Sequence, residues 1–110
     1  IESIILPLIY KVCKLHGIDV VKNVWDREFL GLKLSIKIVK NHHEAITFIN
    51  TYSNNHSEGI IAQNQEVIST FTQLVDAAAL FVNTSTRNHD GYVFGLGAEM
   101  GIATGKLHAR

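Results

Sequence analysis

The sequence has little of several features that mark particular classes of protein. Its 110 residues include one cysteine, one proline and one methionine, and ten Lys and Arg offset ten Asp and Glu to a net charge of zero. A single cysteine excludes an internal disulfide framework and a thiolate zinc cluster, and it favours a reducing compartment. Without a basic excess there is no electrostatic attraction for phosphate backbones, so we expect no nucleic-acid partner.

Long hydrophobic runs are also missing. The longest apolar stretch, residues 4–9, is far shorter than the roughly 20 residues that cross a bilayer, and the first residues show no secretory signal pattern. We therefore expect a cytoplasmic protein that does not associate with membranes. The sequence begins with Ile1 and stops at Arg110 soon after a glycine-rich run, so we expect a fragment of a longer chain.

The sequence does have the composition and patterning of a folded domain, with 46% hydrophobic residues. Helical spacing predicts a first helix with Ser3 as its cap and Gly17 as its stop. A second helix follows Asn41 and ends near Ser53, and a third follows Asn64. Short apolar or alternating runs predict strands over residues 18–21, 34–38, 59–62 and 77–82.

This order of elements predicts an α/β fold built on a parallel-sheet βαβαβ unit with two right-handed crossovers, one through each of the last two helices. The last strand, residues 77–82, is apolar without a break, which is typical of a strand buried on both faces. A polar and glycine-rich segment follows Asn83, and a functional loop is expected there.

Several residues have chemistry that a site would use, but each also has a simpler interpretation. Cys13 lies on the apolar side of the first predicted helix, which favours a structural, half-buried thiol. Adjacent His42 and His43 point about 100° apart on a helix, and none of the six histidines has partners at ligand spacing, so we expect no metal site.

Two further segments are ambiguous when they are considered alone. The run from Asn83 to Arg87 follows a buried strand and offers hydroxyls with a guanidinium, which suits either an anion site or a plain surface loop. The glycines at 95, 97 and 101 are spaced one residue too widely for the dinucleotide fingerprint, so they indicate a turned loop. Glu28 alone indicates a solvated surface charge.

Three ordered motifs resemble a known enzyme family. They are DAAALFVNTSTR at residues 76–87, FGLGAEMGIAT at residues 94–104 and KLHAR at residues 106–110. They are similar to gamma-glutamyl phosphate reductase, also called glutamate-5-semialdehyde dehydrogenase, of the aldehyde dehydrogenase superfamily. The resemblance extends from about Trp25 to Arg110 and continues more loosely through the first helix.

The resemblance implies that the segment is the C-terminal part of an aldehyde-dehydrogenase-like catalytic domain. Residues 1–24 would form an opening helix and strand, residues 25–83 the βαβαβ core, and residues 84–110 a substrate-side and glycine-rich loop. The family uses NADPH to reduce gamma-glutamyl phosphate to glutamate 5-semialdehyde and phosphate in proline biosynthesis, through a cysteine thioester. Cys13 does not match the motif of the nucleophile, which would lie upstream.

The resemblance also assigns residues that bind the cofactor. In this superfamily a glutamate within a Glu-x-Phe-Gly type motif binds the nicotinamide ribose, and Glu28-Phe29-Leu30-Gly31 occupies that place. The resemblance therefore assigns the contact with the nicotinamide ribose to Glu28, and it places Phe29 next to Glu28 in the cofactor-binding segment. A carboxylate can accept hydrogen bonds from both ribose hydroxyls, which would orient the nicotinamide.

On the substrate side, Arg87 and the hydroxyls of Ser85 and Thr86 would hold the substrate's carboxylate or phosphate. Phe94 and Gly95 belong to a run that resembles the loop closing the far side of the substrate tunnel, where glycines allow positive φ. The implied whole enzyme is a homo-oligomer, with glutamate kinase as a candidate partner or as a fused domain.

A different class of protein also fits these residues. The chain would then be a non-catalytic α/β module, kept for binding or assembly after loss of the domain that carries the nucleophile. An upstream extension of the reading frame with a cysteine motif would favour the enzyme, whereas a natural start near Ile1 would favour the module.

Overall fold

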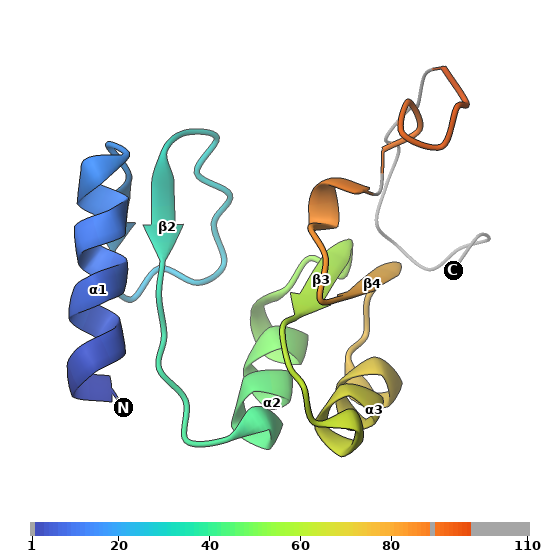
Figure 1. Cartoon of the computed structure of the whole chain (residues 1–110), viewed down its shortest axis with the longest axis horizontal. Helices are drawn as coiled ribbons and strands as arrows, with labels where there is room; N and C mark the ends of the chain where they lie inside the picture. The colour runs from blue at the N-terminus through green and yellow to red at the C-terminus, as the bar shows by residue number, and fades with distance from the viewer. Residues whose placement is uncertain (1, 89, 98–110) are drawn as a thin grey trace. The chain divides into compact units, whose positions relative to one another are not determined.

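The computed structural model of the protein describes residues 2–88 and 90–97, with the side chains of residues 2–5 left undescribed. The chain divides into two compact units, Ile1–Lys40 and Asn41–Arg110, each with its own pair of strands (Figure 1). Within the described residues no helix has both the length and the apolar character that a membrane span needs.

The first unit consists of one helix and two short strands. Helix α1 spans Glu2–Leu15, strand β1 Asp19–Val21 and strand β2 Lys33–Ser35. Gly17 has φ of +67°, so the predicted stop of the helix is confirmed, because glycine adopts this left-handed conformation without steric cost. The helix begins at Glu2, so the prediction that Ser3 is its cap was wrong.

Strands β1 and β2 are parallel and are joined without a helix. Asp19 pairs with Lys33 and Val21 with Ser35, and the connection between the strands is irregular backbone. The predicted strand over residues 34–38 was therefore too long. Because β1 offers only three residues to pair with, β2 ends at Ser35, and Ile36 and Ile38 lie beyond the ladder.

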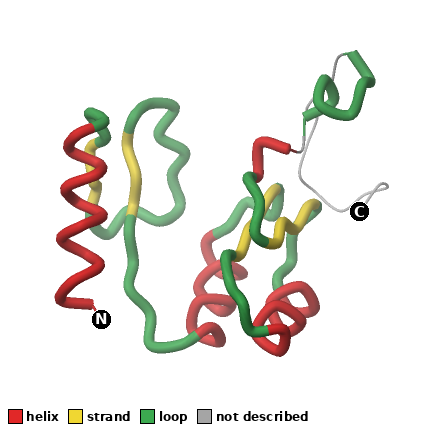
Figure 2. The backbone as a smooth tube through the Cα atoms, viewed as in Figure 1, coloured by secondary structure: helices red, strands yellow, loops and turns green. Residues whose placement is uncertain are grey.

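The second unit contains a complete βαβ crossover (Figure 2). Helix α2 spans His42–Tyr52, strand β3 Ser57–Ile60, helix α3 Gln65–Leu74 and strand β4 Ala79–Val82, and a short 3-10 helix, η1, covers Thr86–Asn88. Strands β3 and β4 are parallel, in the register that places Ser57 opposite Ala79. The predicted α/β class with parallel strands is confirmed. Among the described residues the ladders join β1 to β2 and β3 to β4, so the predicted βαβαβ unit is divided between two ladders, and of its two predicted crossovers only the one through α3 joins paired strands.

The core of the second unit lies between its helices and its strands. Ile46, Phe71 and Val75 are buried, and half-buried Ile60 and Leu80 pack against them with Ile49 and Ala77. All four residues of β4 are half-buried, so the expectation of a strand buried on both faces is only partly met. Among the described residues β4 pairs with β3 alone, so its other edge is open, and apolar strands are fully buried only when both faces of their sheet are also covered.

Both predicted helix caps in this unit are confirmed. The side-chain oxygen of Asn41 accepts a hydrogen bond from the amide of Glu44 at 2.9 Å, and that of Asn64 accepts from the amides of Glu66 at 2.9 Å and Val67 at 3.1 Å. These bonds satisfy N–H groups that have no partner within the helix. Ser53 ends α2 by donating its backbone N–H to the carbonyl of Ile49.

Replacing Asn64 with alanine is expected to lower the free energy of unfolding of the chain by about 1 kcal/mol, because two amides of α3 lose their acceptor. Urea unfolding followed by circular dichroism measures the change. Asn64→Ser is the control, since a serine hydroxyl also caps and should retain most of the stability. Equal losses in both variants would contradict the capping role.

Candidate functional site

The two residues predicted to bind the cofactor lie in the connection between β1 and β2. Glu28 is exposed on irregular backbone, and Phe29 is half-buried beside it. Leu30 follows with φ of +51° and 89% of its surface exposed. A left-handed leucine costs about 1–2 kcal/mol, so the chain turns sharply after Phe29 at some energetic cost. The Glu28 carboxylate is thus presented to solvent at a turn, where both its oxygens can accept hydrogen bonds.

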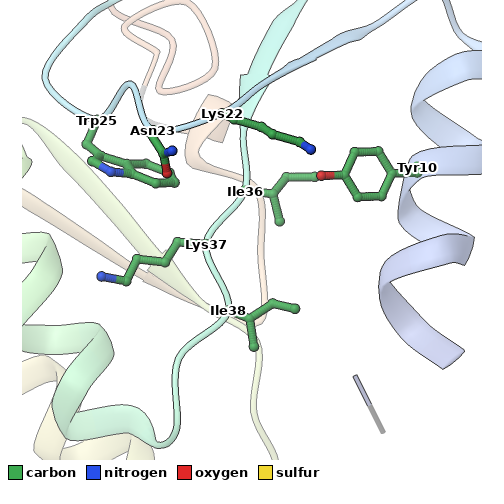
Figure 3. Close-up of a pocket in the computed structure, with 7 residues that line it drawn as sticks. All are labelled: Tyr10, Lys22, Asn23, Trp25, Ile36, Lys37 and Ile38. Carbon is green, nitrogen blue, oxygen red and sulfur yellow. The ribbon is translucent and has the colours of Figure 1, made fainter. Parts of the chain in front are cut away.

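A pocket of about 370 Å³ lies in the same unit, and Trp25 from the same connection lines it (Figure 3). Its wall combines an indole ring, a phenol, two ammonium groups, one carboxamide and two aliphatic side chains. These belong to Tyr10, Lys22, Asn23, Trp25, Ile36, Lys37 and Ile38. The lining suits an anionic group attached to an apolar body. Sequence reasoning missed the pocket because the pairing of β1 with β2 brings together residues that no spacing relates.

The predicted substrate residues Ser85, Thr86 and Arg87 lie together on one exposed turn just beyond β4. The Ser85 Oγ accepts a hydrogen bond from the backbone N–H of Arg87 at 3.2 Å, and the Ser85 carbonyl accepts from the N–H of Asn88 at 3.1 Å. The Asn88 side chain donates to the Thr84 Oγ at 2.7 Å, which closes the turn from Thr84 to Asn88. Arg87 therefore projects from a loop whose own polar groups are largely paired.

The turn lies at the edge of the sheet where α/β proteins bind ligands. Strands β3 and β4 are parallel, so their carboxyl ends, at Ile60 and Val82, lie at the same edge. A Cβ placed on Gly59 would lie 3.6 Å from the Thr86 methyl carbon, an ordinary van der Waals distance, so η1 rests against the end of β3. The structure thus places Ser85, Thr86 and Arg87 together at this edge of the sheet, where they present two hydroxyls and one guanidinium.

Phe94 and Gly95 belong to a separate turn after η1. The N–H of Leu96 donates to the carbonyl of Gly91 at 2.8 Å, and that of Gly95 donates to the carbonyl of Tyr92 at 3.0 Å. Gly95 has φ of +74°, so the predicted positive φ is confirmed there. Phe94 is 64% exposed. Residues 98–104 of this motif, with the KLHAR motif, lie outside the described residues.

The candidates therefore form three local groups. Glu28 and Phe29 lie in the first unit, Ser85 to Arg87 follow β4, and Phe94 with Gly95 forms a later turn. Cys13 is buried, with 5% of its surface exposed, more deeply than the sequence suggested. In residues 2–88 and 90–97 no cluster of three or more His, Cys, Asp or Glu could hold a metal ion.

Comparison with known proteins shows which enzymes the chain is similar to. No family model matches the chain. The gamma-glutamyl phosphate reductases of Bacillus cereus and Bacillus mycoides are 57% and 56% identical to it over 86 residues, which is 78% of this chain and 21% of each of those proteins. The crystal structure of gamma-glutamyl phosphate reductase from Thermotoga maritima matches with a TM-score of 0.86 and 41% identity over 96% of this chain and 29% of that one. The chain is homologous to part of gamma-glutamyl phosphate reductase.

The match to gamma-glutamyl phosphate reductase confirms both the resemblance and the fold class. The chain spans about one fifth of the length of the curated relatives it matches. Its α/β architecture with parallel strands is that of an aldehyde-dehydrogenase-like fold, as the motifs implied.

Proposed function

We propose that this chain is part of the catalytic domain of an NADPH-dependent gamma-glutamyl phosphate reductase, which converts gamma-glutamyl phosphate to glutamate 5-semialdehyde and phosphate in proline biosynthesis. The observation that carries the proposal is the combined similarity of sequence and fold to the Thermotoga enzyme over 96% of the chain. The three local groups of candidate residues supply chemistry that this reaction uses.

A hybrid enzyme tests the proposal directly. This chain would replace the corresponding part of the Bacillus cereus reductase, to which it is 57% identical over 86 residues. We expect the hybrid to oxidise NADPH only when gamma-glutamyl phosphate is present. A hybrid that folds, as judged by circular dichroism and thermal unfolding, but has no such activity would contradict the proposal.

The cofactor side of the proposal rests on Glu28. When bound, NADPH supplies the hydride that reduces the activated acyl group. The residues present fit its nicotinamide ribose, since the Glu28 carboxylate is exposed and can accept hydrogen bonds from two neighbouring hydroxyls. Phe29 beside it is half-buried, and the chain turns at Leu30 directly afterwards, so the carboxylate remains open to the ligand.

Replacing Glu28 with alanine in the hybrid is expected to raise the KM for NADPH about tenfold, because hydrogen bonds to a charged acceptor are lost. Initial rates at varied NADPH measure the change. Asp26→Ala is the matched control, since it removes another exposed carboxylate two positions earlier and should leave this KM unchanged. If the two variants behave alike, Glu28 does not have the proposed role.

The substrate side of the proposal rests on the turn after β4. Arg87 would hold the substrate's carboxylate or phosphate, with Ser85 and Thr86 contributing hydroxyls, and the turn with Phe94 and Gly95 would close the opposite side. Opposite charge and paired N–H donors make a guanidinium suited to such an anion.

The remaining parts of the proposed reaction are assigned outside this chain. Because Cys13 is buried, we place the thiol that captures the acyl group, with release of phosphate, elsewhere in the enzyme. The proposed enzyme acts in the cytoplasm as a homo-oligomer, with glutamate kinase as its candidate partner.

A further inference from the structure

Asn83, the first residue after β4, joins the loops that follow the two strands of the second unit. Its backbone N–H donates to the carbonyl of Ile60 at 2.8 Å. Its side-chain Oδ1 accepts from the N–H of Ala62 at 2.9 Å, and its Nδ2 donates to the carbonyl of Ala62 at 2.9 Å. The carboxamide thus pairs with both polar groups of one residue in the loop between β3 and α3.

This arrangement requires an unusual combination of properties. Asn83 has φ of +56°, a left-handed conformation that asparagine tolerates better than most residues other than glycine. The paired hydrogen bonds also need a donor and an acceptor on two neighbouring atoms, which a carboxamide has. A carboxylate has no donor, and a hydroxyl carries its donor and its acceptor on a single oxygen. Glycine would satisfy the backbone but not the two side-chain bonds.

The position of Asn83 connects this clamp to the candidate substrate turn. The turn from Thr84 to Asn88 begins at the next residue and is closed at its far end by the bond between their side chains. Arg87 is the fourth of its five residues. The clamp therefore fixes the origin of the turn relative to β3 before any ligand arrives, and a preordered loop avoids the entropy cost of ordering on binding.

We propose that Asn83 is a positioning residue that orients the Arg87 turn for the anionic group of the substrate. The inference rests on the proposed function, since it assumes that Arg87 contacts gamma-glutamyl phosphate. Asn83 acts through the loop and does not itself touch the substrate, so its loss should weaken substrate binding selectively.

The test uses the active hybrid enzyme with Asn83→Gly, which keeps the left-handed backbone accessible and removes both side-chain bonds. We expect the KM for gamma-glutamyl phosphate to rise about fivefold to tenfold, the effect of losing two neutral hydrogen bonds, while kcat and the KM for NADPH change less than twofold. In the same hybrid, hydrogen exchange at the Ala62 amide should become faster.

Asn55→Gly is the matched control. Asn55 also has positive φ, at +61°, and its side chain donates to Asp76 at 3.2 Å, but it precedes β3 and so lies at the amino end of the same ladder. This variant should leave the KM for gamma-glutamyl phosphate unchanged. If Asn83→Gly fails to fold, Asn83→Asp replaces it, since aspartate tolerates the same φ and keeps the acceptor for Ala62 while losing the donor.

The outcomes separate the inference from the proposed function. An unmodified hybrid that folds without activity overturns the proposed function and this inference with it. In an active hybrid, an unchanged KM for gamma-glutamyl phosphate with faster exchange at Ala62 shows a clamp that does not position the substrate loop. A variant in which kcat and thermal stability fall together while both KM values rise indicates a general structural role for Asn83. Either of these two results overturns the inference but leaves the proposed function unaffected.

Discussion

Replacing Arg87 with alanine in the hybrid reductase should raise the KM for gamma-glutamyl phosphate by about 10-fold to 100-fold. A charge-assisted hydrogen bond contributes about 1.5–3 kcal/mol, and a guanidinium can form two such bonds with a carboxylate or phosphate. The bonds that hold the turn use the Arg87 backbone and its neighbours' side chains. The substitution therefore removes the guanidinium without opening the turn, and thermal stability should stay near that of the parent.

The Arg87→Lys variant distinguishes the contribution of the positive charge to substrate binding from that of the planar guanidinium. Lysine keeps the positive charge but cannot form the paired, planar contact, so we expect a KM between those of arginine and alanine. Steady-state rates at varied gamma-glutamyl phosphate measure all three proteins. A KM for the alanine variant equal to that of the parent would remove Arg87 from the site, whatever the lysine variant does.

Replacing Phe71 with alanine should lower the free energy of unfolding by about 3–5 kcal/mol, a large part of the roughly 5–15 kcal/mol that stabilises a typical domain. Phe71 is 4% exposed and is one of three buried residues in the core of the second unit, with Ile46 and Val75. Such a small core has few neighbours that can move to fill the space left by the ring. We therefore expect the second unit to lose its cooperative unfolding transition.

Leu74→Ala is the matched control for Phe71→Ala. Leu74 lies on the same helix, α3, but 53% of its surface is exposed, so its truncation should cost less than about 1 kcal/mol. Urea and thermal unfolding of the chain, followed by far-ultraviolet circular dichroism, measure both variants. Similar losses for the two would mean that the core around Phe71 contributes little to stability.

The elements that the sequence predicted best are those with a local cause. Asn41 and Asn64 cap their helices because a side-chain oxygen reaches amides only two or three residues away, and Gly17 ends α1 because it accepts positive φ. The predictions were wrong for strand length and strand burial, because both depend on the neighbouring strand. The strand predicted over residues 34–38 ends at Ser35 because β1 is short, and β4 is half-buried where, among the described residues, it pairs with β3 alone.

The candidate site shows the same division. The motifs identified Glu28, Arg87 and Gly95 along the chain, and the structure places Glu28 and Arg87 on exposed loops and gives Gly95 its positive φ. The pocket lined by Trp25 and the clamp made by Asn83 were missed. Both depend on groups far apart in the sequence, such as Asn83 and Ala62. Local sequence patterns do not predict such contacts.

The sequence by itself determined the α/β class, the helix caps, the family resemblance and the segments with useful chemistry, because each follows from a local pattern or an ordered motif. Tertiary structure alone decided which strands pair, that Cys13 is buried, and that Asn83 forms hydrogen bonds with Ala62. The physical reason is that these properties depend on contacts between distant residues, whose free energies are set only when the chain has folded.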